Sequence, residues 1–212
     1  MKDQTAQIEQ RVQRYWYSDG IGELIGGGVF LILAMYFTAQ QYFGDESVVG
    51  NLLQAAFVLI LIGAIFLGRT LINALKARVT YPRTGYVEYR QNGRSLMLRR
   101  FLAFLVAIAV AMAAVFITRR IESIDSTVAI TGGLVAVIFI VKQGWSSGVA
   151  RFYVFSLISL ALGVALSVSG LSSGYNLGLF YGIMGLTLAI SGGLTLRRYL
   201  SQNPMPAESG HE

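Results

Sequence analysis

Six long stretches of apolar residues alternate along the chain with short polar segments. A helix needs about 20 largely apolar residues to cross the roughly 30 Å hydrocarbon core of a bilayer. No proline interrupts any of the six stretches, so each can form a continuous helix. The pattern therefore predicts an all-α integral membrane protein with six transmembrane helices, at Ile21–Gln40, Val49–Leu75, Phe101–Thr118, Thr127–Val141, Phe152–Ser169 and Leu177–Leu196.

The composition agrees with a membrane protein. The chain is 54% hydrophobic and 13% charged, and its mean hydropathy is +0.58. Six spans would take up more than half of the 212 residues and leave no room for a sizeable soluble domain. We expect one transmembrane domain over residues 19–200.

The distribution of positive charge predicts the topology. Of the 17 Lys and Arg residues, all but Arg119 and Arg120 fall on one side of the membrane when the six stretches are taken as spans. Basic residues are retained on the cytoplasmic side. The sequence thus predicts three antiparallel helical hairpins in the plasma or inner membrane, with both termini cytoplasmic. The net charge of +6 does not indicate nucleic-acid binding, because the cations cluster at helix ends and in one loop.

The two ends of the chain are predicted to lie in the cytoplasm. Gln4–Tyr17 has apolar residues at helical spacing and ends in aromatic residues, which is typical of an amphipathic helix at the headgroup level. Residues 1–18 are therefore expected to form an interfacial segment. Residues 201–212, with two prolines and the single histidine, are expected to form a disordered tail.

The loop at residues 76–100 is the only interhelical segment long enough to have a structure of its own. Asn92-Gly93 is a favoured pair for a two-residue β-turn, and it is flanked by residues that suit short strands. We expect a small cytoplasmic β-hairpin here. Pro82 and Gly85 predict a second turn, at Tyr81–Tyr86.

The same loop supplies the candidate binding residues. Arginine forks suit carboxylates and phosphates, and Tyr and Arg are enriched at binding hot spots. A docking surface for a cytoplasmic or membrane protein partner is one interpretation of this loop. The other is that it only holds the topology and rests on anionic lipid headgroups. The candidates for contact with partner or lipid are Tyr81, Arg83, Tyr86, Tyr89, Arg90 and Arg94.

Two acidic residues flank the start of the first span. Asp19 is placed to cap the helix by accepting from its free amides. Glu23, one turn later, is placed to form an ion pair with Arg69, Lys142, Arg151 or Arg197, which end helices at similar depth. The simpler interpretation is that both carboxylates only complement the helix dipole.

Residues that carry catalysis or hold metals are scarce. The chain has no cysteine, and its one histidine, His211, is penultimate, so neither a catalytic triad nor a transition-metal site is expected. No glycine-rich phosphate loop is present. No charged residue falls near the centre of a span, which argues against a proton-driven pump. We expect no cofactor.

Three classes of function remain. The first is a non-enzymatic subunit, scaffold or anchor for a partner that binds the basic and aromatic loop. The second is a small transporter or channel for a neutral or lipid-like solute, assembled from several copies of the chain and lined by polar residues such as Ser156, Ser159 and Asn176. The third, with the least support, is an enzyme that acts on lipid headgroups through Asp19 and Glu23.

Overall fold

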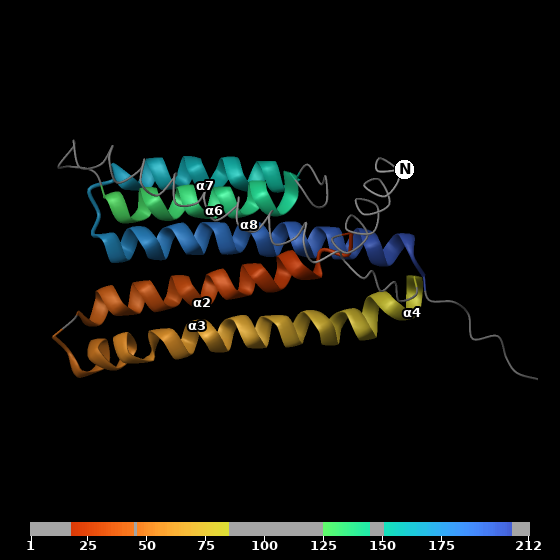
Figure 1. Cartoon of the computed structure of the whole chain (residues 1–212), viewed down its shortest axis with the longest axis horizontal. Coiled ribbons are helices and arrows are strands. Elements are labelled where there is room, and N and C mark those ends of the chain that lie inside the picture. The colour runs from red at the N-terminus through yellow and green to blue at the C-terminus, as the bar shows by residue number, and fades with distance from the viewer. Residues whose placement is uncertain (1–17, 45, 85–124, 145–150, 205–212) are drawn as a thin grey trace, which may run out of the picture.

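The computed structural model describes residues 18–44, 46–84, 125–144 and 151–204. These ranges are helical and contain no strand, which confirms the all-α class (Figure 1). The helices are α2 (Ile21–Phe43), α3 (Val48–Leu75), a π-helical turn η1 (Lys76–Thr80), α4 (Tyr81–Thr84), α6 (Ser126–Gly144), α7 (Arg151–Ser167) and α8 (Ser173–Gln202).

Three helical stretches are long and apolar enough to cross a membrane. They are Ile21–Phe43, Val48–Arg83 and Ser173–Gln202. The helices α6 and α7, at the fourth and fifth predicted spans, are apolar but shorter. The third predicted span, the interfacial segment before Ser18 and the β-hairpin lie outside the described residues. Ser201 and Gln202, expected in the tail, belong to α8.

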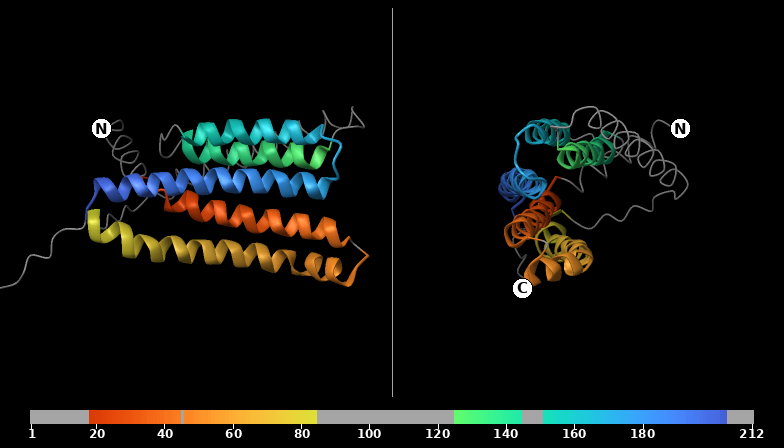
Figure 2. Two further views of the ribbon diagram at one scale, coloured as in Figure 1. Left: turned by 180° about the vertical axis from the view of Figure 1, so that it is seen from behind. Right: turned by 90° about the vertical axis from the view of Figure 1, so that its left-hand side faces the viewer.

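The helices form a bundle and lie side by side, with α2 and α7 running in one direction and α3, α6 and α8 in the other (Figures 1 and 2). The two most extensive contacts are between α2 and α8 and between α6 and α7. The contact between α7 and α8 is smaller, and α3 packs on the outer side of α2. The most extensive contacts therefore include that between the first and last described helices, which hairpins formed only between sequence neighbours would not bring together.

Glycines allow α2 and α8 to approach closely. A Cβ added to Gly27 would lie 2.7 Å from the backbone nitrogen of Ala189 and 2.7 Å from the carbonyl oxygen of Gly185. Gly192 packs against the backbone of Leu24 in the same way. Gly185 and Gly192 are seven residues apart, so they share one face of α8. Close approach at small residues is a common basis of helix association in membranes.

A second pair of small residues joins α6 to α7. Gly132 and Gly163 face each other, and a Cβ on Gly132 would lie 2.7 Å from the Cα of Gly163. The hydroxyl of Ser159, which is fully buried, donates to the carbonyl oxygen of Gly132 at 2.9 Å. The two closely packed pairs then meet across an apolar layer that includes Phe155, Phe180 and Met184.

The helix that starts as α3 continues past Leu75, where the loop was expected. Lys76–Thr84 is helical, so the turn predicted to begin at Tyr81 is wrong for its described part. The N–H of Tyr81 bonds to the carbonyl oxygen of Lys76, five residues back, which makes η1 a π-turn. Pro82 has no N–H to donate, and in an unbroken α-helix its ring would clash with the carbonyl four residues earlier. The wider turn lets Pro82 occupy the first turn of α4, where proline is tolerated.

Candidate functional site: a buried charge cluster at one end of the bundle

Four charged side chains meet around the start of α2. Asp19, Glu23 and Lys76 are buried, and the side chain of Arg151 is 25% exposed. They come from the turn before α2, from α2 itself, from η1 and from α7. The group has two acids and two bases, so its formal charges cancel.

Asp19 joins the start of α2 to the end of α3. Gly20, at φ +69°, turns the chain into α2 and leaves Asp19 fully buried beside the helix. One carboxylate oxygen of Asp19, Oδ1, accepts from the N–H of Ile21 at 3.1 Å. The other, Oδ2, lies 3.1 Å from Lys76 Nζ and accepts from the Thr80 hydroxyl at 3.1 Å. The carboxylate thus caps α2 and binds both ends of η1.

Glu23 joins α2 to α7 and α8. Its Oε1 accepts from Arg151 Nε at 2.5 Å, and its Oε2 accepts from the Ser191 hydroxyl at 3.3 Å. Arg151 Nη1 also donates to the Thr195 hydroxyl on α8 at 3.3 Å. The Glu23–Arg151 pair therefore links α2, α7 and α8.

Both carboxylates already have partners. Removing two charges from water is costly, and a buried ion pair is maintained only when further hydrogen bonds complete its geometry. Asp19 and Glu23 meet that condition with different cations on different helices. The arrangement fixes how the helices sit against one another, and it leaves neither carboxylate open to a substrate. The hypothesis of a lipid-headgroup enzyme gains no support from this geometry.

A second polar cluster lies at the opposite end of the bundle. Asn176 of α8 is fully buried, and its amide nitrogen donates to Asp125 Oδ2 at 2.9 Å and to the Leu171 carbonyl at 3.1 Å. Its amide oxygen accepts from the Ser169 hydroxyl at 2.8 Å. Asp125 Oδ1 also accepts from the N–H of Thr127 in the first turn of α6. This cluster joins the start of α6 to α8.

The polar residues considered for a solute path make contacts between helices. Ser156 and Ser159 donate to carbonyl oxygens of α6, Ser191 donates to Glu23, and Asn176 donates to Asp125. Their hydrogen-bonding groups are therefore used in packing. This observation favours a structural role for these side chains over a polar seam.

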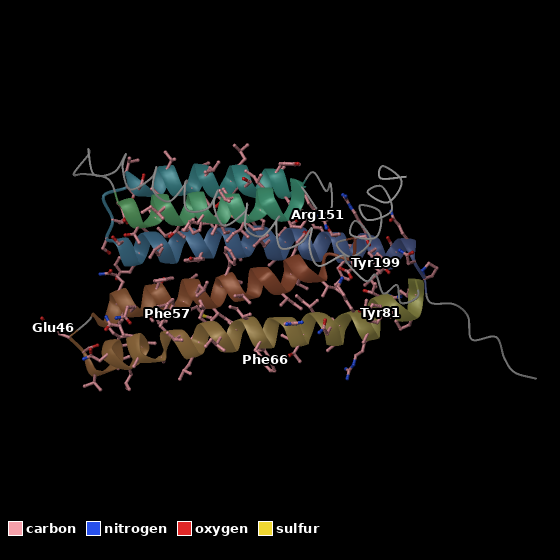
Figure 3. The ribbon with its side chains drawn as sticks, viewed as in Figure 1. Glu46, Phe57, Phe66, Tyr81, Arg151 and Tyr199 are labelled. Atoms are coloured by element: carbon pink, nitrogen blue, oxygen red, sulfur yellow. The ribbon has the colours of Figure 1, made fainter. Side chains whose placement is uncertain are left out.

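The predicted docking residues are only partly described. Tyr81 and Arg83 lie on α4, at the end of the bundle that holds the charge cluster (Figure 3). The Nε and Nη1 atoms of Arg83 have no hydrogen-bond acceptor among the described residues. Tyr86, Tyr89, Arg90 and Arg94 lie outside the described residues.

Lys76 and Thr80 were not anticipated as partners of Asp19. The available signal was their spacing, because residues four apart share one face if the second span continues as a helix. Among the described residues, no group of three or more His, Cys, Asp or Glu side chains lies close enough to hold a metal ion. Comparison of the chain with protein-family models, with curated proteins and with solved structures finds no match.

Proposed function

We propose that this chain is a multi-pass protein of the plasma or inner membrane, with six spans and both termini in the cytoplasm. Large apolar side chains on the outer faces of α3, α7 and α8 support contact with lipid; Leu59, Phe66 and Leu157 are each more than two-thirds exposed. Exposed cations of the described ranges include Arg78, three residues before Tyr81, and Arg197 and Arg198, just before Tyr199. Tyr81 and Tyr199 lie at one end of the bundle, and Glu46 lies at the other (Figure 3). Asp125, directly before α6, lies at the same end as the start of α8, where it bonds to Asn176. By the positive-inside rule, the first end is cytoplasmic.

The lengths of α6 and α7 are compatible with this topology. At about 1.5 Å per residue, 19 and 17 residues extend roughly 28 and 25 Å, close to the roughly 30 Å of the hydrocarbon core. Polar groups at both ends of this pair, Asp125 at one and Arg151 at the other, are suited to the two interfaces. The third proposed span, at Phe101–Thr118, depends on its apolar sequence.

The proposed activity is non-enzymatic: the protein anchors a cytoplasmic partner, as a subunit or scaffold, through the segment Tyr81–Arg94. The buried contact of Asp19 with Lys76 and Thr80 is the observation that carries this proposal. This contact fixes η1, which ends one residue before Tyr81 and continues the helix of α3. The segment Tyr81–Arg94 is therefore attached to a fixed part of the bundle. A preorganised surface loses less conformational entropy when it binds. The Nε and Nη1 atoms of Arg83 are buried and have no acceptor among the described residues, and a guanidinium suits a carboxylate or a phosphate.

A pull-down from native membranes in mild detergent tests the anchoring role. The test variant changes Arg83, Arg90 and Arg94 to Gln. The matched control changes Arg78, Arg197 and Arg198 to Gln, which removes the same charge from the same end of the protein. A stoichiometric protein partner lost from the test variant and kept by the control supports the proposal. A partner retained by both variants, or recovery of lipid alone with the wild type, contradicts it.

A further inference from the structure

Arg69 is a charged residue within the most apolar of the described candidate spans. It lies in the candidate span Val48–Arg83, whose mean hydropathy reaches 2.4 over 18 residues. Its neighbour Gly68 packs against Ile25 and Val29 of α2, whereas Arg69 itself is exposed on the side of α3. Arg69 precedes Lys76 by seven positions, which places it about 10 Å further from the cytoplasmic end than the Asp19–Lys76 pair.

The described part of the chain offers Arg69 no carboxylate. Asp19 is paired with Lys76, and Glu23 is paired with Arg151. The remaining described acids lie at the opposite end of the bundle: Glu46 in the turn between α2 and α3 (Figure 3), and Asp125 against Asn176 at the start of α8. A cation at the edge of a hydrocarbon region is costly unless it reaches an anion or the interface. Arg69 is therefore stabilised either by the headgroup region or by an anion from outside the described bundle.

The surroundings of Arg69 face away from the other described helices. Phe66, three residues earlier, is 73% exposed and points outward from α3 (Figure 3). Asn73, four residues later, is also exposed, so it shares a face with Arg69 one turn nearer the cytoplasmic end. The patch thus presents a guanidinium and an amide beside an aromatic ring, on a surface that α2 does not cover.

We infer that Arg69 and Asn73 form a binding site for the phosphate of an anionic phospholipid in the cytoplasmic leaflet. The guanidinium fork matches two phosphate oxygens, and the amide of Asn73 supplies a further donor. The exposed apolar side chains on the outward surface of α3 accommodate the acyl chains. The inference rests on the proposed membrane placement, but it does not depend on the anchoring role of Tyr81–Arg94.

Native mass spectrometry of the delipidated protein, titrated with phosphatidylglycerol, tests this site. We expect Arg69→Gln to weaken the tightest phosphatidylglycerol site about fivefold, as follows from about 1 kcal/mol for a basic residue near an anionic surface. Asn73→Ala should weaken it less. The matched control is Arg78→Gln, because Arg78 is an exposed arginine in η1, which follows α3 directly. This control should leave the affinity of the tightest phosphatidylglycerol site unchanged.

Two results would overturn the inference. One is an unchanged phosphatidylglycerol affinity in Arg69→Gln. The other is an equal loss in Arg78→Gln, which would indicate attraction by net charge and not a site. Alkaline carbonate extraction of the wild type is a separate test of membrane placement: release from the membrane would contradict that placement, whatever the lipid titration gives.

Discussion

Asp19 and Lys76 form a buried ion pair, with Oδ2 and Nζ 3.1 Å apart. The pair joins the start of α2 to the end of α3, although the chain connects these two helices at their opposite ends. Thr80 donates to the same carboxylate oxygen. Among the described helices, α3 has its extensive contact with α2, and this pair attaches the C-terminal end of α3 to the start of α2. At the other end of the same face, Phe57 packs against Tyr36.

Breaking this pair on one side should destabilise the protein. Lys76→Met leaves Asp19 buried with hydrogen-bond donors but no counter-charge, and we expect a loss of about 3–5 kcal/mol of unfolding free energy, as is typical when a buried pair loses one partner. Reversible unfolding in mixed detergent micelles measures this loss. The double variant Asp19→Asn/Lys76→Met removes both charges and should recover part of it. A double variant less stable than Lys76→Met would show that the charge of Asp19 is not the cause.

The glycine contacts between α2 and α8 predict a contrast between neighbouring positions. Gly27→Ala places a methyl group against the backbone of α8 and should cost about 1–3 kcal/mol through forced separation of the helices. A Cβ at position 28 would meet no described atom within 4 Å, so Gly28→Ala should leave the free energy of unfolding unchanged or raise it slightly, because alanine favours the helix. Thermal melting in detergent compares the two variants. Equal melting temperatures would mean that the close contact between the helices does not contribute to stability.

The polar cluster around Asn176 should be sensitive to loss of the amide. Asn176→Leu leaves Asp125 and Ser169 without their buried partner, and we expect a cost of about 2–3 kcal/mol. Thr187→Val on the same helix is the control, because the Thr187 hydroxyl only bonds back to the carbonyl oxygen of Ile183. If both substitutions cost the same free energy, a specific role for the cluster is excluded.

The proposed topology predicts opposite labelling at the two ends of the bundle. The natural chain has no cysteine, so single cysteines report their own position. A membrane-impermeant maleimide should label Glu46→Cys in intact cells, since Glu46 is exposed at the turn between α2 and α3. Ser201→Cys, exposed near the end of α8, should label only after permeabilisation. The reverse pattern would place both chain ends outside the cytoplasm.

Most of the described helices were predictable from the sequence, because the length of an apolar run is a local property. The first two spans begin within one residue of α2 and α3, and α6 and α7 also start within one residue of their predicted spans. The prediction was wrong at Lys76–Thr84, where polar residues and Pro82 suggested a loop. The π-turn and the buried contacts of Lys76 and Thr80 stabilise the helix there, and both are tertiary or backbone effects that residue preferences do not contain.

The sequence by itself determined that this is an apolar helical chain with charges at the helix ends, since hydrophobicity and charge placement act residue by residue. Only the tertiary structure decided that Glu23 pairs with Arg151, out of four basic residues at similar depth, and that α8 packs against α2. Those choices depend on the rotation and register of each helix, which are set by close contacts such as that of Gly27 with Gly185. Such contacts form between residues far apart in the chain, so no local pattern specifies them.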